Sequence, residues 1–333
     1  MASVLVIGGG LAGCTVALEL AQNNINVIIV EKSATIGGKV RHYGCKATDR
    51  CNRCGLCLVG DLWRQVERHE NIKILTQTQV VDIIGNKGAF TAVIKGKEYV
   101  DTISGFNNVV VSAGFDEFTT LSTGSLEYEE SEHIITGNDL ERLLANRGKN
   151  EIFSHPLSSV GFIQCFGSRD IKEKAAYCSR VCCGYATRAA KVLREYYPYI
   201  KITFFYMDFQ ELEGLECFDD LLKDNIEFVR CRPVSVKAGT PNVIVYEHPE
   251  DHRLVERSMD LLILSEGIYP SDEFEELAEI CMLGLNENGF MSYIKDPRES
   301  GIYLAGCVAG PRRIEEVYAE SLQVAREICG GIS

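Results

Sequence analysis

The sequence is short of long apolar runs and of positive charge. No run approaches the roughly 20 apolar residues that a membrane-spanning helix needs, so a transmembrane protein is not expected. The first residues already have the apolar pattern of a buried strand. They show neither the basic segment nor the cleavage site of a secretory signal peptide, which favours a cytoplasmic location. Because 34 lysines and arginines stand against 47 acidic residues, the formal net charge is −13. Nucleic acids and anionic membranes bind basic patches, so neither is an expected partner.

Several other patterns are missing as well. The chain has no repeat of solenoid period and no low-complexity segment. No Ser-His-Asp grouping and no paired-carboxylate motif can be assigned, so the catalytic residues stay unknown. What remains is a composition of 46% hydrophobic and 24% charged residues over 333 positions, which suffices for two globular domains of ordinary size.

Cysteine, by contrast, is abundant. Fourteen cysteines are many for a cytoplasmic chain, and in a reducing compartment they favour metal or redox chemistry over a disulfide framework. Four lie between Cys45 and Cys57 and four between Cys165 and Cys183, whereas the other six are scattered. Most of the scattered ones are interpreted as small buried residues. Chemistry is therefore expected at the two groups.

The order of the apolar runs predicts an α/β protein. A strand at 4–7, a glycine turn, a helix to about Asn23 and a strand at 26–30 form one β–turn–α–β unit. A second unit is expected from a strand at 160–163, a helix to about Tyr196 and a strand at 202–206, with a further strand at 261–264. Strands are also expected at 109–114 and 301–306, and a final helix starts near Arg313. We expect one domain built from 1–150 and 268–333, and a smaller domain, 151–267, inserted in it.

The first turn has the pattern of a dinucleotide site. Gly8-x-Gly10-x-x-Gly13 follows a strand, opens a helix, and is followed by Glu31 at the end of the next strand. Gly8 permits the tight turn, Gly10 lets the backbone approach a pyrophosphate, and Gly13 lets the helix pack on the strand. The helix N-terminus would bind the pyrophosphate and Glu31 the adenosine ribose. The alternative is a glycine-rich turn with a structural role only.

Other segments favour FAD over NAD at this site. The segment 37–39 resembles the second glycine pair of two-dinucleotide-domain flavoproteins, and 111–114 resembles the end of their Ala-Thr-Gly strand. Gly306 and the helix near Ile314 resemble their C-terminal flavin-contacting segment. Cys307 is a departure, because those enzymes usually carry there the aspartate that binds the ribityl chain. The candidate FAD-binding residues are Gly8, Gly10, Leu11, Ala12, Gly13, Glu31, Lys32, Gly38, Lys39, Val80, Ala113, Gly114, Gly306, Cys307 and Ile314.

The expected fold class is therefore α/β, with two Rossmann-like dinucleotide-binding domains of the thioredoxin and glutathione reductase flavoprotein type. In the second domain, however, the turn at 162–169 has a cysteine and bulky side chains in place of the glycines that admit a pyrophosphate. No NAD(P) is expected at this turn.

The second turn carries four cysteines instead, namely Cys165, Cys178, Cys182 and Cys183. Four thiolates is the ligand count of a [4Fe–4S] cluster, whose negative charge Arg169 and Arg180 could offset. Zinc also accepts four thiolates, usually as two separated C-x-x-C pairs, and the adjacent pair of cysteines fits that spacing poorly. Buried free cysteines are the remaining alternative.

Two segments here resemble a known family. Ile163–Asp170 and Tyr177–Cys183 are similar to the signature of HdrA, the flavoprotein subunit of heterodisulfide reductase, and 114–118 and 304–311 are similar to other segments of that family. The resemblance covers nearly the whole chain. It implies that Cys165, Cys178, Cys182 and Cys183 ligate a non-standard [4Fe–4S] cluster, and that the chain works in sulfur metabolism, in a cytoplasmic complex with other heterodisulfide reductase-like subunits and as a homodimer. The chain is too short for the extra ferredoxin domains of the large members, so electron bifurcation is not carried over.

The first cysteine group, Cys45, Cys51, Cys54 and Cys57, has two open interpretations besides a zinc site. Its C-x-x-C-x-x-C run resembles ferredoxin spacing, with Cys45 as a fourth ligand of a second cluster. It also lies where glutathione-reductase-like enzymes have a redox-active dithiol, which would here be Cys51 and Cys54. The first interpretation predicts about eight irons per chain, and the second about four or none.

The functional hypothesis is an FAD-containing oxidoreductase that relays electrons between its flavin and iron–sulfur clusters. The rival is an NAD(P)H-dependent flavin disulfide reductase that uses Cys51 and Cys54. A third hypothesis is a structural subunit whose FAD is not turned over.

Overall fold

A computed structural model describes residues 2–117, 131–146, 153, 157–172, 174–210 and 226–332. The chain divides into two compact units. We call Met1–Arg41, Gly55–Asp116 and Tyr269–Ser333 the terminal unit, and His42–Cys54 with Glu117–Ile268 the inserted unit. Within the described residues, no helix is both long and apolar enough to cross a bilayer.

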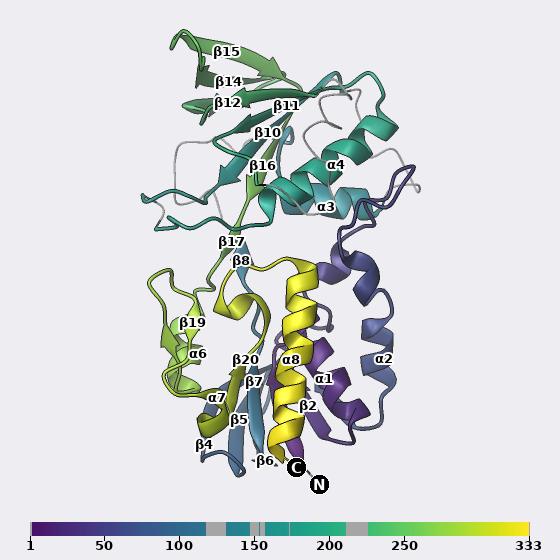
Figure 1. The fold of residues 1–333 in the computed structure, drawn as a ribbon, viewed down its shortest axis with the longest axis vertical. Coiled ribbons are helices and arrows are strands. Elements are labelled where there is room, and N and C mark those ends of the chain that lie inside the picture. Colours follow the sequence, from purple (N-terminus) through teal and green to yellow (C-terminus); the bar gives the residue numbers. More distant parts are fainter. Residues whose placement is uncertain are drawn as a thin grey trace. The chain divides into compact units, whose positions relative to one another are not determined.

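The terminal unit is built on a five-stranded parallel sheet (Figure 1). Its strands lie in the order β20 (Ile302–Leu304), β7 (Asn108–Val111), β1 (Ser3–Ile7), β2 (Asn26–Val30) and β3 (Ile72–Leu75). The central strands are buried because helices cover the sheet, which explains why they read as continuous apolar runs. The helices α1 (Leu11–Gln22) and α8 (Ile314–Ile332) lie side by side, with α2 (Leu62–Arg68) next to α1.

A three-stranded antiparallel sheet completes this unit together with shorter elements. Its strands are β4 (Thr78–Ile84), β5 (Phe90–Gly96) and β6 (Val100–Phe106). Half-buried alternation on β4 and β5 is typical of such a sheet, which was not among the predicted elements. The shorter elements are η1 (Lys39–His42), η2 (Leu56–Val59), α6 (Phe274–Ile280), β18 (Gly284–Leu285), β19 (Met291–Ser292), α7 (Pro297–Ser300) and η5 (Gly306–Ala309).

The inserted unit repeats the parallel-sheet pattern. Its strands lie in the order β12 (Glu227–Arg230), β11 (Lys201–Tyr206), β10 (Ser159–Phe166), β16 (Leu261–Glu266) and β9 (Ile134–Thr136). The helices α3 (Gly137–Ala145) and α4 (Cys182–Tyr196) pack on one face, over a core in which Phe204 stacks on Phe162 and Phe228 with ring centroids 4.7 and 5.2 Å apart. The short strands β8 (Asp116–Glu117) and β17 (Ile268–Tyr269) pair where the chain passes between the units.

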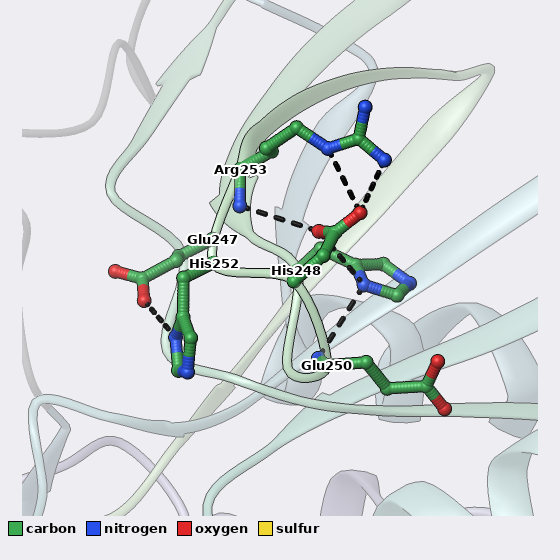
Figure 2. A network of polar contacts seen from close by, with 6 residues as sticks. Glu247, His248, Glu250, His252 and Arg253 are labelled. Carbon is green, nitrogen blue, oxygen red and sulfur yellow. Dashed lines mark hydrogen bonds and ion pairs between the residues drawn. The ribbon is translucent and has the colours of Figure 1, made fainter.

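A second antiparallel sheet in this unit consists of β13 (Ser235–Lys237), β14 (Asn242–Glu247) and β15 (Leu254–Met259). Figure 2 shows the turn between β14 and β15, where two histidines lie among acidic side chains. His252 contacts Glu247 at 2.6 Å and His248 contacts Asp251 at 3.3 Å, while Arg253 pairs with Asp251. These polar side chains pair with one another at the surface, so the turn is a solvated feature.

The division into units differs from the predicted boundary near residue 150. Strand β9 and helix α3 precede that residue but belong to the inserted unit, because β9 pairs in register with β16. The predicted stretch of connection and one short helix over 117–150 contains α3, while 118–130 and 147–150 lie outside the described residues. The segment His42–Cys54 also belongs to the inserted unit, although it follows β2 in the chain.

Candidate functional site

The glycine turn after β1 is tight because its glycines leave no room for side chains. Gly8 has φ +101°, and a Cβ at this residue would overlap the carbonyl oxygen of Ser112. A Cβ at Gly13 would overlap the carbonyl oxygen of Gly8. These two glycines therefore let α1 start directly against the end of the sheet, as the sequence predicted.

Gly10 has a different role, because a Cβ at this residue would meet no protein atom within 4 Å. Gly10 is the N-cap of α1, without a capping side chain and without an acidic residue in the first turn. The backbone of Gly10 is therefore open to a ligand, and no capping side chain occupies the start of the helix, which suits a bound anion. Gly38 lies beside the turn, since its Cβ would be 3.1 Å from the Cα of Gly10.

Glu31 lies at the carboxyl end of β2 and is buried. Its two oxygens accept the backbone N–H groups of Gly9 and Ser33, each at 2.7 Å. These bonds orient the carboxylate beside the glycine turn and leave further lone pairs for hydroxyl donors. The arrangement fits the predicted contact with a ribose.

The other candidate residues of this unit are distributed around the same turn. Leu11 and Ala12 are buried in the first turn of α1, and Val80 is buried in β4. Ala113 and Gly114 follow β7, and Gly114 has φ +86° with no protein atom near the position of a Cβ. Lys32 forms an ion pair with Glu273 at 2.7 Å, and the ammonium of Lys39 lies 5.2 Å from the centroid of the Phe115 ring.

The C-terminal segment packs on this turn but departs from the flavoprotein pattern in two ways. A Cβ at Gly306 would lie 2.7 Å from that of Ala12, so the segment contacts the start of α1. Burial raises the pKa of the Cys307 thiol to about 11, and its Sγ donates to the carbonyl of Arg312 at 3.6 Å. A neutral thiol cannot replace a carboxylate. Before Ile314, the first residue of α8, the N–H of Arg313 donates to the Glu316 carboxylate at 2.8 Å, so this helix N-terminus is capped by its own side chain.

The turn after β10 is longer and is folded into a small hairpin. The N–H of Arg169 donates to the carbonyl of Tyr177 at 3.1 Å, and Asp170 and Ala175 exchange backbone hydrogen bonds. Cys165, Gly167, Arg169 and Arg180 all have positive φ values between 55° and 68°. Such left-handed residues turn successive N–H groups to one side and are a feature of anion and iron–sulfur sites.

The hairpin brings the four predicted cysteine ligands of the second group to one pocket. The pocket is small and partly open to solvent, and its lining consists of Cys165, Ser168, Cys178, Ser179, Arg180, Cys182, Cys183, Asp208 and Gln210. Cys165 lies near the end of β10, Cys178 lies in the hairpin, and Cys182 and Cys183 are the first residues of α4. Residues that are distant in the sequence thus meet where β10 ends and α4 begins.

Burial and the neighbouring thiols keep three of these cysteines, Cys165, Cys182 and Cys183, protonated in the absence of a cation. Burial raises the pKa of Cys182 well above its usual value, and neighbouring Cys165, Cys183 and Cys178 raise it further. Burial likewise raises the pKa of Cys183 to about 11 and that of Cys165, although the Arg169 guanidinium opposes the shift at Cys165. A bound cation would reverse this balance and favour the thiolates.

Arg169 only partly provides such positive charge, because it also forms an ion pair with Asp208. Arg180, the other predicted arginine, lines the pocket. In the part of the chain that the structure describes, no group of three or more His, Cys, Asp or Glu side chains has the arrangement of a metal site. The four cysteine sulfur atoms share a pocket without converging on one point.

The first cysteine group is divided between the units. Cys45, Cys51 and Cys54 belong to the inserted unit and Cys57 to the terminal unit. Cys45, Cys51 and Cys57 are exposed, and all four are free thiols. The sulfur of Cys45 accepts the N–H of Ala47, and that of Cys51 accepts the N–H of Arg53, each at 3.4 Å. These contacts are compatible with either predicted role of the group.

Two contacts that the sequence did not predict hold the segment 42–54 on the inserted unit. Lys46 and Glu141 form an ion pair in which both side chains are buried. Arg188 of α4 donates to the carbonyl oxygens of Asn52 at 2.7 Å and Arg53 at 3.0 Å. Neither contact leaves a signal in the sequence, because its partners are about 95 and 135 residues apart.

Comparisons with known proteins agree with this geometry. Residues 6–60 match the family model of the NAD(P)-binding Rossmann-like domain. A thioredoxin reductase from T. acidophilum, 15% identical, superimposes with a TM-score of 0.67 over 100% of both chains. The likeness confirms the predicted α/β fold class with two Rossmann-like units.

Curated relatives match nearly the whole chain. An iron-sulfur subunit of the CoB–CoM heterodisulfide reductase of Methanopyrus kandleri, of the HdrA type, is 28% identical over 96% of this chain and 63% of its own length. The HdrA subunit of the ferredoxin/F(420)H(2)-dependent CoB-CoM heterodisulfide reductase of Methanosarcina acetivorans is 25% identical over 98% of this chain and 52% of its own. The chain thus spans between half and two thirds of the length of these relatives. The resemblance that the cysteine motifs indicated is confirmed: the chain is similar to A subunits of heterodisulfide reductases over nearly its whole length.

Proposed function

We propose that this protein is an oxidoreductase subunit that binds FAD in the terminal unit and a [4Fe–4S] cluster in the inserted unit, and that it transfers electrons between them and partner subunits. The observation that carries the proposal is the pocket that gathers Cys165, Cys178, Cys182 and Cys183 at the end of β10. Names of the curated relatives, which include an iron-sulfur subunit of a heterodisulfide reductase, support the same assignment.

The residues of the terminal unit fit FAD. The N–H groups at the start of α1 would bind the pyrophosphate in the space beside Gly10, and Glu31 would accept hydrogen bonds from the ribose. The flavin supplies exchange between two-electron and one-electron chemistry when bound. Cys307 is protonated and turned to the carbonyl of Arg312, so it would not act as the ribityl-binding carboxylate does in related flavoproteins.

The donor set of the pocket fits an iron–sulfur cluster better than isolated thiols. Four sulfur ligands are the number that a [4Fe–4S] cluster takes, and the N–H of Arg180 already donates to the sulfur of Cys178 at 3.3 Å. Since the thiols repel each other's ionisation, a cationic iron core would stabilise all four as thiolates.

The same residues argue against a nicotinamide coenzyme at this turn. Where the first turn leaves open space at Gly10, the start of α4 is occupied by Cys182 and Cys183. A pyrophosphate at this helix N-terminus would have to displace their side chains. We therefore propose that electrons enter or leave through protein partners.

The partners proposed are other heterodisulfide reductase-like subunits of a sulfur-metabolising complex in the cytoplasm, with this chain as a homodimer. The first group, Cys45, Cys51, Cys54 and Cys57, of which all but Cys54 are exposed, is proposed as the ligand set of a second cluster. In this scheme the domains are 1–41, 55–116 and 269–333 for FAD, and 42–54 with 117–268 for the cluster.

The test is oxygen-free purification followed by analysis of FAD, iron and acid-labile sulfide. One FAD with about four irons per chain supports one cluster, and about eight irons support two. NADH is then added to the protein. Reduction of the flavin by NADH in iron-free protein would instead favour the disulfide reductase with Cys51 and Cys54. A flavin that neither dithionite nor a partner can turn over would favour the structural subunit.

A further inference from the structure

Two serines join the loops that carry the cysteines of the pocket. The hydroxyl oxygens of Ser168 and Ser179 lie 2.6 Å apart, and both residues are buried, with 1% and 0% of their surface exposed. Ser168 is close to Cys165 in the chain, and its N–H donates to the carbonyl of Cys165 at 3.0 Å, which closes a tight turn. Ser179 is the neighbour of Cys178 in sequence. The hydroxyl pair thus connects the end of β10, which carries Cys165, with the segment that carries Cys178 through a single contact.

Ser179 also anchors the hairpin to the end of the sheet. Its hydroxyl accepts the N–H of Ile268 at 3.0 Å, and the hydroxyl of Tyr177 donates to the carbonyl of the same Ile268 at 3.0 Å. A Cβ at Gly267 would overlap both serine hydroxyls, so a glycine at this position makes room for them. Backbone atoms of 267–268 and the two hydroxyls therefore form one packed junction.

Both serines line the same pocket as the cysteines, yet their hydroxyls are already paired with each other and with Ile268. They are therefore placed to hold the loops and not to ligate. We propose that the Ser168–Ser179 pair is a positioning device: it joins the segments that carry Cys165 and Cys178, so that the thiols stay in one pocket and less of the chain has to be ordered when metal binds. This inference rests on the proposed function of the pocket, and it goes beyond that function by assigning the residues that keep the ligands in place.

The proposal makes an ordered prediction for two variants. Ser168→Ala removes the hydroxyl pair alone, whereas Ser179→Ala also leaves the buried N–H of Ile268 without an acceptor. Loops that are no longer joined must be ordered when metal binds, which weakens binding. We expect a loss of metal affinity of about five-fold for Ser168→Ala and about 30-fold for Ser179→Ala. The double variant should resemble Ser179→Ala, because the shared bond is lost only once.

The experiment is an anaerobic titration of the full-length, reduced, iron-free protein with Co²⁺. Binding is measured by the thiolate-to-cobalt charge-transfer absorption. Cobalt reports the thiolates directly, and its band intensity reports how many bind. Ser258→Ala, on the exposed part of β15 in the same unit, is the matched control and should titrate like the wild type. Reconstituted iron content of each variant is measured alongside.

The outcomes separate this inference from the proposed function. If the wild type takes up neither Co²⁺ nor iron in the pocket, the proposed function fails and this inference fails with it. If the wild type binds both and the serine variants bind as tightly, only the inference is overturned. If Ser179→Ala does not accumulate as folded protein, the metal affinities of Ser168→Ala and Ser258→Ala are compared, and this comparison alone decides whether the inference holds.

Discussion

The two units contain the same β–turn–α arrangement after β1 and β10, but the turns differ in the space that they leave at the N-terminus of the following helix. In the first, Gly8–Gly10 joins strand to helix directly and leaves space at the helix N-terminus. In the second, residues 167–181 form a hairpin, and cysteines occupy the start of α4. A parallel sheet presents the carboxyl ends of its strands at one edge, so either turn can become a binding site. The residues in the turn then decide between a phosphate and a metal.

The largest effect is expected from breaking the second turn. Cys182→Ser should remove the iron of the pocket, about four irons per chain, because oxygen replaces a thiolate at a buried position between three other cysteines. FAD content should stay at the wild-type level, because the first turn is in the other unit. Iron, labile sulfide and flavin analysis measure both quantities.

Cys231→Ser is the control for this change, since Cys231 is a half-buried thiol of the same unit outside the pocket. Loss of FAD in Cys182→Ser, or full iron retention, would contradict the contrast between the turns.

The next effect concerns the two kinds of glycine in the first turn. Gly13→Ala should destabilise the terminal unit by about 1–3 kcal/mol or more, because the added methyl group overlaps the carbonyl of Gly8. Gly10→Ala should leave the stability of the apoprotein within about 0.5 kcal/mol, because its Cβ meets no protein atom. It should nevertheless weaken FAD binding at least about ten-fold, since the backbone can no longer approach the pyrophosphate.

Urea unfolding of apoprotein and FAD titration distinguish the two variants. Equal losses of stability in both would show that Gly10 serves packing and not a ligand.

A smaller effect concerns pH and Glu266, at the end of β16. Burial raises the pKa of this carboxyl to about 7. Hydrogen bonds from the N–H groups of Gly137 and Asn138 lower the pKa but do not outweigh burial. The folded state thus retains a proton that the unfolded chain releases near pH 4.5. The contribution of Glu266 to stability is therefore greatest below about pH 4.5 and decreases as pH rises to about 7, by about 3 kcal/mol in total.

Glu266→Gln, which is neutral at every pH, should remove that slope. Urea unfolding of iron-free protein between pH 4.5 and 7.5 measures it. A slope that is the same in both proteins would contradict the assignment of the proton to Glu266.

The smallest effect is expected at the turn in Figure 2. His252→Ala removes the hydrogen bond to Glu247, between side chains that are 75% and 56% exposed. Because water and salt screen such pairs, the unfolding temperature should change by about 1 °C or less, and iron and FAD should be unaffected. A change in metal content would mean that the histidines of this turn take part in a site.

Much of the fold was predictable because strands and helices leave local patterns. The runs at 4–7, 26–30, 202–206 and 261–264 each became a strand, and the helices began and ended within a few residues of their predicted limits. The weakly patterned antiparallel sheets were missed, since half-exposed strands such as β6 and β15 carry few apolar residues. The boundary near 150 also differed, because nothing local in β9 indicates that it pairs with β16.

The sequence by itself determined the chemistry available to this protein: a glycine turn for a dinucleotide and thiols in two groups. The spacing of residue types along the chain carries that information. Only the tertiary structure decided which side chains meet. In the folded chain Ser168 contacts Ser179, burial raises the pKa of Cys307, and the first cysteine group is divided between the units. Contacts and desolvation depend on parts of the chain far apart in sequence, so no local pattern could have determined them.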